Sequence, residues 1–213
     1  MARTPQAASG VMRDPLPRSV FERDTIDVAR SLLGCTLVRR TATHVLEGII
    51  VETEAYLGER DLGCHSARGR TPRTEPMYGP PGRAYVYLIY GMYHCLNAVT
   101  RGEGEPEAVL VRAVRPKRGE KQMSANRVTR SGRTPDGVAL TNGPGKLCQA
   151  FEIDLSLNNA DLCKSENPLI ITGGHQPPDE KIRTGPRVGI DYAGEWAAKP
   201  LRFWVDGDRY VSR

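Results

Sequence analysis

The clearest alternation of apolar and polar positions in the chain lies between Ile49 and Gly58. The stretch opens with three β-branched residues, a composition typical of a strand with buried neighbours. A strand points alternate side chains to one face, so two carboxylates and a phenol should share a face. Buried carboxylates are costly unless paired or used, so this face is either a site or a solvated edge. The residues expected on it are Ile50, Glu52, Glu54 and Tyr56, opposite Ile49, Val51, Thr53 and Ala55.

The same kind of pattern predicts the elements around this strand. A helix capped by Asp24 or Thr25 should carry apolar positions as far as Leu33 and end at Gly34. Other strands are expected where β-branched and aromatic residues concentrate, and short helices where apolar positions follow a helical spacing. The expected strands are 35–40, 46–56, 85–89, 95–99, 108–114, one beginning at Pro186 and one at 201–205; the expected short helices are 120–127 and 146–153.

Two segments between these elements are unusual. Leu57–Arg83 is a long loop rich in proline, glycine and arginine, and loops of this length in a compact domain are functional or disordered. Its direct return into a strong strand pattern favours a function. The next two strands should form a hairpin with its turn near Tyr90-Gly91-Met92-Tyr93. Turns are normally polar, so these aromatic residues either form a binding site, fold back onto the core or pack on another chain.

The composition suits a single compact domain. The chain has 213 residues, of which 39% are hydrophobic and 26% charged. We expect a flexible N-terminal tail at 1–17 and one domain at 18–213. No apolar run is long enough to span a bilayer, and the N-terminus lacks the apolar region of a signal peptide, so secretion is not expected. Five widely spaced cysteines favour reduced thiols in the cytosol or nucleus.

Positive charge is concentrated in one segment. The net charge is +5 and the isoelectric point is about 9.0, which permits an anionic partner. Between Arg115 and Thr134 the chain has seven Lys or Arg and one acidic residue, Glu120, so this segment alone carries a charge of +6. It is either a solvated loop or a phosphate-facing surface, and the two are compatible because such loops order on binding.

The motifs exclude several common kinds of site. The adjacent pairs Cys64-His65 and His94-Cys95 do not suit zinc, because neighbouring strand residues point to opposite faces and zinc ligands have wider spacing. The sequence has no GxSxG motif and no glycine-rich phosphate-binding motif. The remaining features are strand carboxylates, a basic loop with one histidine, an aromatic hairpin and clustered cations. An enzyme that flips a base out of DNA and hydrolyses its N-glycosidic bond needs these features.

The order of the motifs resembles that of the alkyladenine (methylpurine, 3-methyladenine) DNA glycosylase family. The resemblance runs from about Asp24 to the C-terminus. It is weakest in the N-terminal tail, in the basic stretch after Pro116 and between Leu155 and Arg183. The motifs that carry it are Val51–Gly58, His65-Ser66, Tyr85–Tyr93, Leu110–Ala113, Gly143–Ala150, Arg187–Gly189 and Gly194–Phe203.

The resemblance implies a monofunctional DNA glycosylase of base excision repair. Such an enzyme flips alkylated or deaminated purines, of the 3-methyladenine, 7-methylguanine, hypoxanthine and ethenoadenine type, and hydrolyses the N-glycosidic bond with an activated water. The implied fold is mixed α+β, a single domain around a curved antiparallel β-sheet with flanking helices and a protruding β-hairpin, without metal or cofactor. The implied partner is double-stranded DNA that contains damaged purines. We expect a monomer that binds no membrane and is cytoplasmic (nucleoid) in a bacterium or nuclear in a eukaryote.

The resemblance also implies roles for individual residues. Glu54 corresponds to the general base that activates the water, and Arg112 to the group that helps hold this water and a nearby phosphate. Tyr90 corresponds to a wedge inserted into the minor groove, with Met92 and Tyr93 beside it. The expected base pocket comprises Tyr56, His65, Tyr85, Tyr87, Asn97 and Leu110, and the expected backbone contacts are Arg70, Arg73, Arg127, Arg130, Lys146 and Lys199.

Two other functions stay open on the sequence. A non-catalytic nucleic-acid-binding domain could keep the same scaffold and basic surface. The presence of Glu54 with Arg112 argues against it, because a binding domain needs no base beside a cation. A nuclease would usually need a cluster of acidic metal ligands, and the central strand offers only Glu52 and Glu54. Release of free base without magnesium, with the strand left intact until alkali is added, would separate the three functions.

Overall fold

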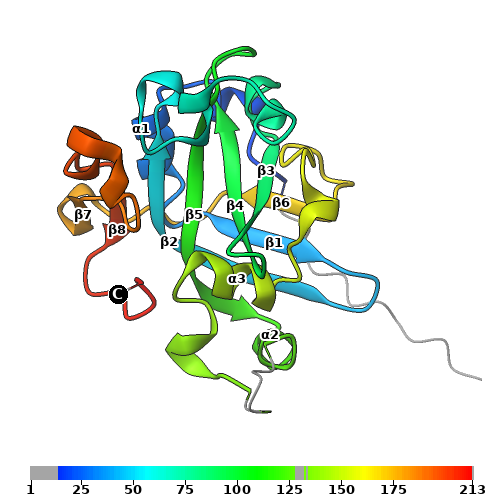
Figure 1. Cartoon of the computed structure of the whole chain (residues 1–213). Helices are drawn as coiled ribbons and strands as arrows, with labels where there is room; N and C mark the ends of the chain where they lie inside the picture. The colour runs from blue at the N-terminus through cyan, green and yellow to red at the C-terminus, as the bar shows by residue number, and fades with distance from the viewer. Residues whose placement is uncertain (1–13, 128–131, 133, 213) are drawn as a thin grey trace, which may run out of the picture.

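The computed structural model describes residues 14–127, 132 and 134–212 (Figure 1). In this part of the chain, eight antiparallel strands form one sheet, and three short α-helices accompany them. The strands are β1 Thr36–Arg40, β2 Val45–Tyr56, β3 Ala84–Ile89, β4 Tyr93–Thr100, β5 Glu107–Arg118, β6 Leu169–Thr172, β7 Ile182–Gly185 and β8 Arg202–Val205. The α-helices are α1 Thr25–Ser31, α2 Glu120–Ala125 and α3 Pro144–Ala150. Single-turn and short 3-10 helices are η1 Arg18–Val20, η2 Gly58–Arg60, η3 His65–Arg68, η4 Glu75–Tyr78, η5 Gly137–Leu140, η6 Leu155–Leu157, η7 Asp179–Lys181 and η8 Asp191–Ala197.

Strand β2 lies at the centre of the sheet. It pairs with β5 on one edge, while its first half pairs with β1 and its end pairs with β8 on the other edge. The strand order is β3-β4-β5-β2-β1-β6, with the β7–β8 ribbon added beside the end of β2. Figure 1 shows β1 and the start of β2 running across the view, while β4 and β5 stand upright. The expected α+β architecture around a curved antiparallel sheet is confirmed.

The curvature of β2 corrects one expectation from its alternation. The register with β5 shifts between Ile50 and Thr53, as at a β-bulge. Ile50 therefore lies in the main apolar core together with Ala55, whereas Glu54 contacts Arg112 on the other side of the sheet. The prediction that Ile50 shares a face with the glutamates is wrong, because the bulge reverses the alternation once. Glu52, Glu54 and Tyr56 do share a face, since Arg112 contacts both carboxylates and the Tyr56 hydroxyl donates to Glu54.

The sheet separates the apolar core from a polar face. On β3, β4 and β5 the core-facing residues alternate with the residues of the polar face, as the two-residue period of a strand requires. Helix α1 covers the core side, and its N-cap Asp24 accepts a hydrogen bond from Ile26 N at 2.9 Å, as expected. Core-facing positions include Val86, Leu96, Ala98, Val109 and Val111; polar-face positions include Tyr85, Tyr87, Cys95, Asn97, Leu110 and Arg112.

Strands β3 and β4 form the expected hairpin, and its tip is exposed. The Tyr90 side chain is 81% exposed, and Met92 and Tyr93 are also exposed. Tyr90 has a φ of 54° and Gly91 a φ of 67°, and Met92 N donates to Ile89 O across the turn at 3.2 Å. Positive φ at both residues is a conformation that glycine and asparagine adopt more readily than a bulky residue does. The aromatic tip therefore does not fold back onto the core.

The long loop after β2 is an ordered wall on the polar face. Residues 57–83 contain η2, η3 and η4, and they bury Cys64, Met77 and Tyr78. Cys64 and Met77 pack with Tyr85 in a small second cluster. The loop therefore adds a layer that the sheet alone lacks.

The basic segment is partly absorbed into the sheet. Strand β5 continues to Arg118, so the segment begins as a strand and not as a loop. Lys117 and Arg118 form ion pairs with Glu47 at 3.2 and 3.6 Å, and Arg115 pairs with Asp208 at 3.2 Å. The expected helix at 120–127 is present as α2. The rest of the segment includes residues 128–131 and 133, which lie outside the described residues.

The C-terminal third differs from expectation in one place. The strand expected from Pro186 is wrong: the strand is β7, which ends at Gly185. Pro186 has no N–H to extend a ladder, and the Arg187 side chain is bound by Asp61, which lies in the loop after β2. At the N-terminus, Leu16 N donates to Ile171 O of β6, and the division into a tail and one domain stays a prediction. Among the described residues, no helix has the length and apolar character needed to cross a membrane.

Candidate active site

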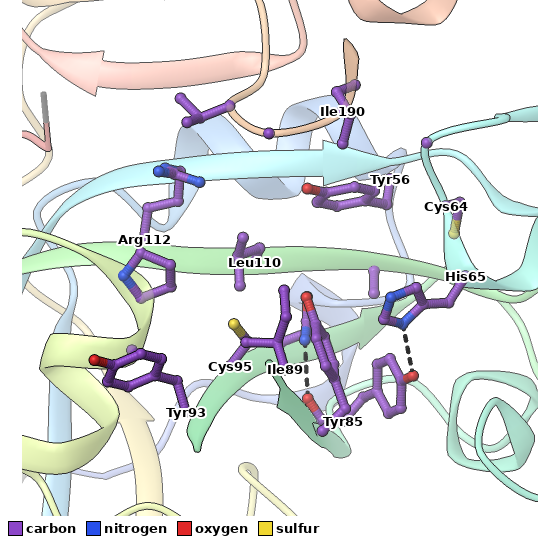
Figure 2. Close-up of a pocket in the computed structure, with 18 of the residues that line it drawn as sticks. Tyr56, Cys64, His65, Tyr85, Ile89, Tyr93, Cys95, Leu110, Arg112 and Ile190 are labelled. Carbon is purple, nitrogen blue, oxygen red and sulfur yellow. Dashed lines mark hydrogen bonds between the residues drawn. The ribbon is translucent and has the colours of Figure 1, made fainter. Parts of the chain in front are cut away.

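A cavity of about 270 Å³ opens on the polar face of the sheet (Figure 2). Its walls come from β2, the β3–β4 hairpin, β5, the loop before η3, the start of α3 and the loop 188–192. A mainly aromatic cavity with a few convergent polar groups is the usual form of a small-molecule site, and this volume suits one planar group. The structure brings all six expected base-pocket residues to this cavity, namely Tyr56, His65, Tyr85, Tyr87, Asn97 and Leu110.

Glu54 is fully buried, next to residues that line the cavity. Its Oε1 atom is 3.3 Å from Arg112 Nη1 and accepts a hydrogen bond from Val188 N at 2.8 Å. Its Oε2 atom accepts a hydrogen bond from the Tyr56 hydroxyl at 2.9 Å. All three donor residues line the cavity. An ionised carboxylate has about four acceptor positions, and among the described residues Glu54 uses two for hydrogen bonds and one for the Arg112 ion pair.

Glu52 is equally buried, and it accepts more hydrogen bonds than Glu54. Its Oε1 atom accepts from Arg112 Nε at 3.1 Å, from Arg202 Nε at 2.6 Å and from Ser212 Oγ at 2.8 Å. Its Oε2 atom accepts from Ser212 N at 2.6 Å. These four bonds tie the C-terminal segment to β2. Glu52 is thus a structural ion-pair partner that holds Arg112 in place for Glu54.

Aromatic rings surround the middle of the cavity. The His65 and Tyr87 ring centroids are 4.4 Å apart, and those of Tyr85 and Tyr87 are 5.3 Å apart. His65 Nδ1 is hydrogen-bonded to the Tyr85 hydroxyl at 2.9 Å, as the dashed line in Figure 2 marks. Asn97 Nδ2 donates to Tyr85 O at 3.0 Å, which fixes the orientation of the amide. The ring planes are therefore held by hydrogen bonds before any ligand enters.

These ring groups are uncharged at neutral pH. Burial, followed by the positive charges of Arg73 and Arg68, lowers the pKa of His65 to about 4. Burial raises the pKa of Tyr85 to about 12 and holds the pKa of Tyr56 well above its usual range, the latter with help from the Glu54 charge. An electron-poor base would thus meet neutral aromatic surfaces, while charge is confined to the glutamate end of the cavity.

Three residues to which the sequence assigned no role support the site, and of these Val188 lines the cavity. Val188 supplies the main-chain donor to Glu54, and the preceding Arg187 is paired with Asp61 in the interior. The only signal in the sequence was the match of Arg187–Gly189 to a family motif without an assigned role. Residue spacing along the sequence could not reveal the Asp61–Arg187 ion pair, because the two residues are 126 positions apart.

Comparison with known proteins identifies the family. A family model described as methylpurine-DNA glycosylase (MPG) matches residues 19–209. The chain belongs to the methylpurine-DNA glycosylase family. It is therefore a hydrolase of N-glycosidic bonds and acts in DNA repair.

Relatives from distant organisms match over nearly the whole chain. A Myxococcus xanthus protein is 47% identical over 199 residues, covering 93% of each chain. A Methanocella arvoryzae protein is 48% identical over 198 residues, covering 93% of this chain and 96% of its own length. A Desulfitobacterium hafniense protein is 46% identical over 201 residues, covering 92% and 98%. Each carries the name "Putative 3-methyladenine DNA glycosylase".

The basic residues expected to contact the DNA backbone differ in whether an acidic group of the protein already neutralises their charge. Arg70 donates to both oxygens of Glu75 at 2.6 and 2.8 Å, so its charge is neutralised locally. Arg73 lies 5.3 Å above the Tyr87 ring and donates weakly to Leu88 O, which places it at the rim of the glycosylase cavity. Arg73 is the better candidate for a phosphate contact near the cavity.

The other expected backbone contacts lie further along the chain. Arg127 donates to Ala139 O and Leu140 O, so it braces a loop, and burial lowers its pKa. Lys146 donates to Asn142 Oδ1 at 2.8 Å. Lys199 lies 3.4 Å from the Trp196 ring centroid. Arg130 lies outside the described residues.

The cysteines and acidic groups complete the inventory of reactive side chains. All five cysteines are free thiols, and Cys64 and Cys95 line the cavity. Burial raises the pKa of both thiols, so they are protonated at neutral pH. Within residues 14–127, 132 and 134–212, no group of three or more His, Cys, Asp or Glu could hold a metal ion.

Proposed function

We propose that this glycosylase flips damaged purines out of duplex DNA into the aromatic cavity and hydrolyses the N-glycosidic bond with a water that Glu54 activates. The proposed substrates are alkylated or deaminated purines of the 3-methyladenine, 7-methylguanine, hypoxanthine and ethenoadenine type. The names of the relatives support the first of these substrates. The proposed products are the free base and an abasic site. We further propose that the enzyme acts as a monomer in the compartment that holds the DNA.

One observation carries this proposal: the buried glutamate with fewer protein hydrogen bonds is the one whose partners line the cavity. Glu52 accepts four hydrogen bonds, three of them from Arg202 and Ser212, which do not line the cavity. Glu54 accepts two, from Tyr56 and Val188, and forms an ion pair with Arg112, and all three of these residues line the cavity. A general base must reach the proton that it takes, so Glu54 is the candidate. Arg112 gives its Nε proton to Glu52 and one Nη2 proton to Ser212, and its remaining Nη protons can orient the same water.

The geometry supports a sequence of steps at this site. Tyr90 at the exposed hairpin tip enters the base stack and fills the space of the extruded nucleotide, which offsets part of the unstacking free energy. The base slides between Tyr56, His65 and Tyr87, and Asn97 bounds the pocket. As the bond to the base lengthens, the sugar gains oxocarbenium character, and the Glu54 carboxylate stabilises it while deprotonating the water.

The test compares matched variants of the two glutamates. Glu54→Gln keeps the shape of the side chain and removes the base, so single-turnover excision should fall by about 10²–10⁴-fold while binding to lesion DNA is retained. Glu52→Gln breaks a buried, fully hydrogen-bonded ion pair, so it should lower thermal stability strongly, by about 3–5 kcal/mol. Circular dichroism melting and single-turnover rates separate the two effects.

The substrate class is tested on a panel of duplexes. Each duplex carries one alkylated purine, hypoxanthine or ethenoadenine, and base release is measured with EDTA present. Free base should appear with the strand intact until alkali is added. Parent-like excision by Glu54→Gln would overturn the assignment of the base. Strand cleavage without alkali would instead favour the nuclease, and lesion binding without base release would favour the non-catalytic binding domain.

A further inference from the structure

A buried ion pair lies behind the cavity wall. Arg187 Nη1 and Nη2 contact the two oxygens of Asp61 at 2.5 and 2.7 Å, and both side chains are fully buried. The geometry is bidentate, the strongest and most directional form of an arginine–carboxylate contact. A pair of buried charges adds little net stability compared with apolar residues of similar volume. Its presence beside the active site therefore calls for a role other than stability.

The pair joins three segments that surround Glu54. Arg187 Nη1 also donates to Ala55 O on β2 at 2.9 Å, and the guanidinium lies 4.6 Å from the Tyr56 ring centroid. Asp61 accepts from Leu57 N and Gly63 N, which fixes the turn after β2. The next residue after Arg187 is Val188, whose N–H donates to Glu54. Figure 2 shows the Ile190 side chain of this region next to Tyr56.

The Asp61–Arg187 pair carries no net charge. Three buried carboxylates in this region, Glu52, Glu54 and Asp61, are matched by the guanidinium groups of Arg112, Arg187 and Arg202. Loss of the Asp61 charge would leave Arg187 as an unbalanced cation behind Tyr56. The charged and titratable groups that face Glu54 are Arg112, Arg187, Tyr56, Tyr87, Cys95 and, across Arg112, Glu52.

We propose that Asp61 and Arg187 are positioning residues for the reaction. Together they form a brace that orients two groups donating hydrogen bonds to Glu54, the Tyr56 hydroxyl and the Val188 N–H. Arg187 packs against the Tyr56 ring and carries Val188 to Oε1, while Asp61 orients Arg187 and cancels its charge. The brace thus sets both the direction of the carboxylate and the field around it. This inference rests on the proposed role of Glu54 as the base.

The brace is tested in the full-length protein with Asp61→Asn and with the double variant Asp61→Asn/Arg187→Met. Asp61→Asn is isosteric and leaves Arg187 uncompensated. Single-turnover excision at neutral pH should fall by about 10–100-fold, because small misplacements of reacting groups have effects of this size. The acid limb of the pH–rate profile should move to lower pH, because an extra cation favours the ionised carboxylate. In the double variant the acid limb of the pH–rate profile should return to its position in the parent enzyme, while the excision rate stays low.

Asp161→Asn is the matched control. Asp161 is buried, pairs with Arg18 Nη2 at 2.7 Å and accepts from Cys163 N two residues on, as Asp61 accepts from Gly63 N. It lies outside the cavity wall. The control should lower the melting temperature by an amount similar to Asp61→Asn and leave both the rate and the pH–rate profile at the parent values.

The outcomes separate the two proposals. If Asp61→Asn matches the control in rate and profile, the pair is structural only and the brace is overturned. If Asp61→Asn is too unstable to assay, the double variant decides: it has no unpaired charge, and a parent-like rate would overturn the brace. If Glu54→Gln keeps parent activity, the assignment of the base fails, whatever the Asp61 variants do.

Discussion

Tyr90→Asn should make this enzyme more stable and less active. Tyr90 lies in the left-handed region at φ 54°, where a residue with a bulky side chain is strained. Asparagine tolerates this conformation, and Asn-Gly is a favoured pair in tight hairpin turns. The sequence here is Tyr90-Gly91, so the substitution converts the turn into a preferred one.

The expected magnitude follows from exposure and backbone strain. Because the Tyr90 side chain is 81% exposed, its removal takes away little buried surface. The left-handed conformation costs an ordinary L-residue about 1–2 kcal/mol, and asparagine recovers part of this. A gain on the order of 1 kcal/mol raises the melting temperature of a domain of this size by about 2–4 °C. Excision from duplex DNA should fall, because asparagine cannot fill the space left in the stack.

The assay compares melting temperature with single-turnover excision from duplex and single-stranded substrates. Excision from single strands should fall less, because there is no stack to open. Tyr93→Asn is the control: the Tyr93 ring packs against Gly145, so its loss should lower the melting temperature. A drop of several degrees in Tyr90→Asn would refute the reasoning about strain. An equal loss of rate on both substrates would refute the wedge.

Three further predictions follow from the site. The pKa of His65 is about 4 in the folded protein, against a usual value of 6.5. As pH falls, the unfolded chain therefore binds a proton at His65 before the folded protein does. Urea unfolding should therefore show stability lost between about pH 6.5 and 4, and His65→Gln should flatten that slope. In Gly145→Ala, the added Cβ would lie 3.0 Å from Tyr93 Cβ, so the Tyr93 side chain must shift. Excision should fall, and the free energy of unfolding should drop by about 1–3 kcal/mol. Unchanged excision kinetics would contradict the contact. Arg73→Gln should lower the salt dependence of duplex binding by about one counterion, and Arg70→Gln by less, because Glu75 already neutralises Arg70; equal slopes for both variants would contradict this difference.

Local patterns predicted most of the scaffold. The helix at α1, the hairpin and the strands β1, β2 and β5 follow from alternation, capping and turn residues, all of which act within a few positions of the chain. In the structure, Tyr85, Tyr87 and Asn97 line the same cavity, as the family resemblance implied. Local reasoning failed where a distant contact intervened. The bulge in β2 moved Ile50 to the core, and the predicted strand at Pro186 gave way to a loop held by Asp61.

The sequence by itself determined which residues are available for chemistry at β2, because two carboxylates on an apolar strand demand partners wherever the chain folds. It could not decide which glutamate belongs to the cavity. Glu52 is bound by Arg202 and Ser212, which lie 150 and 160 residues further along the chain, whereas the partners of Glu54 line the cavity. This difference between the two glutamates is a property of the tertiary structure, because only folding brings such distant partners to their carboxylates.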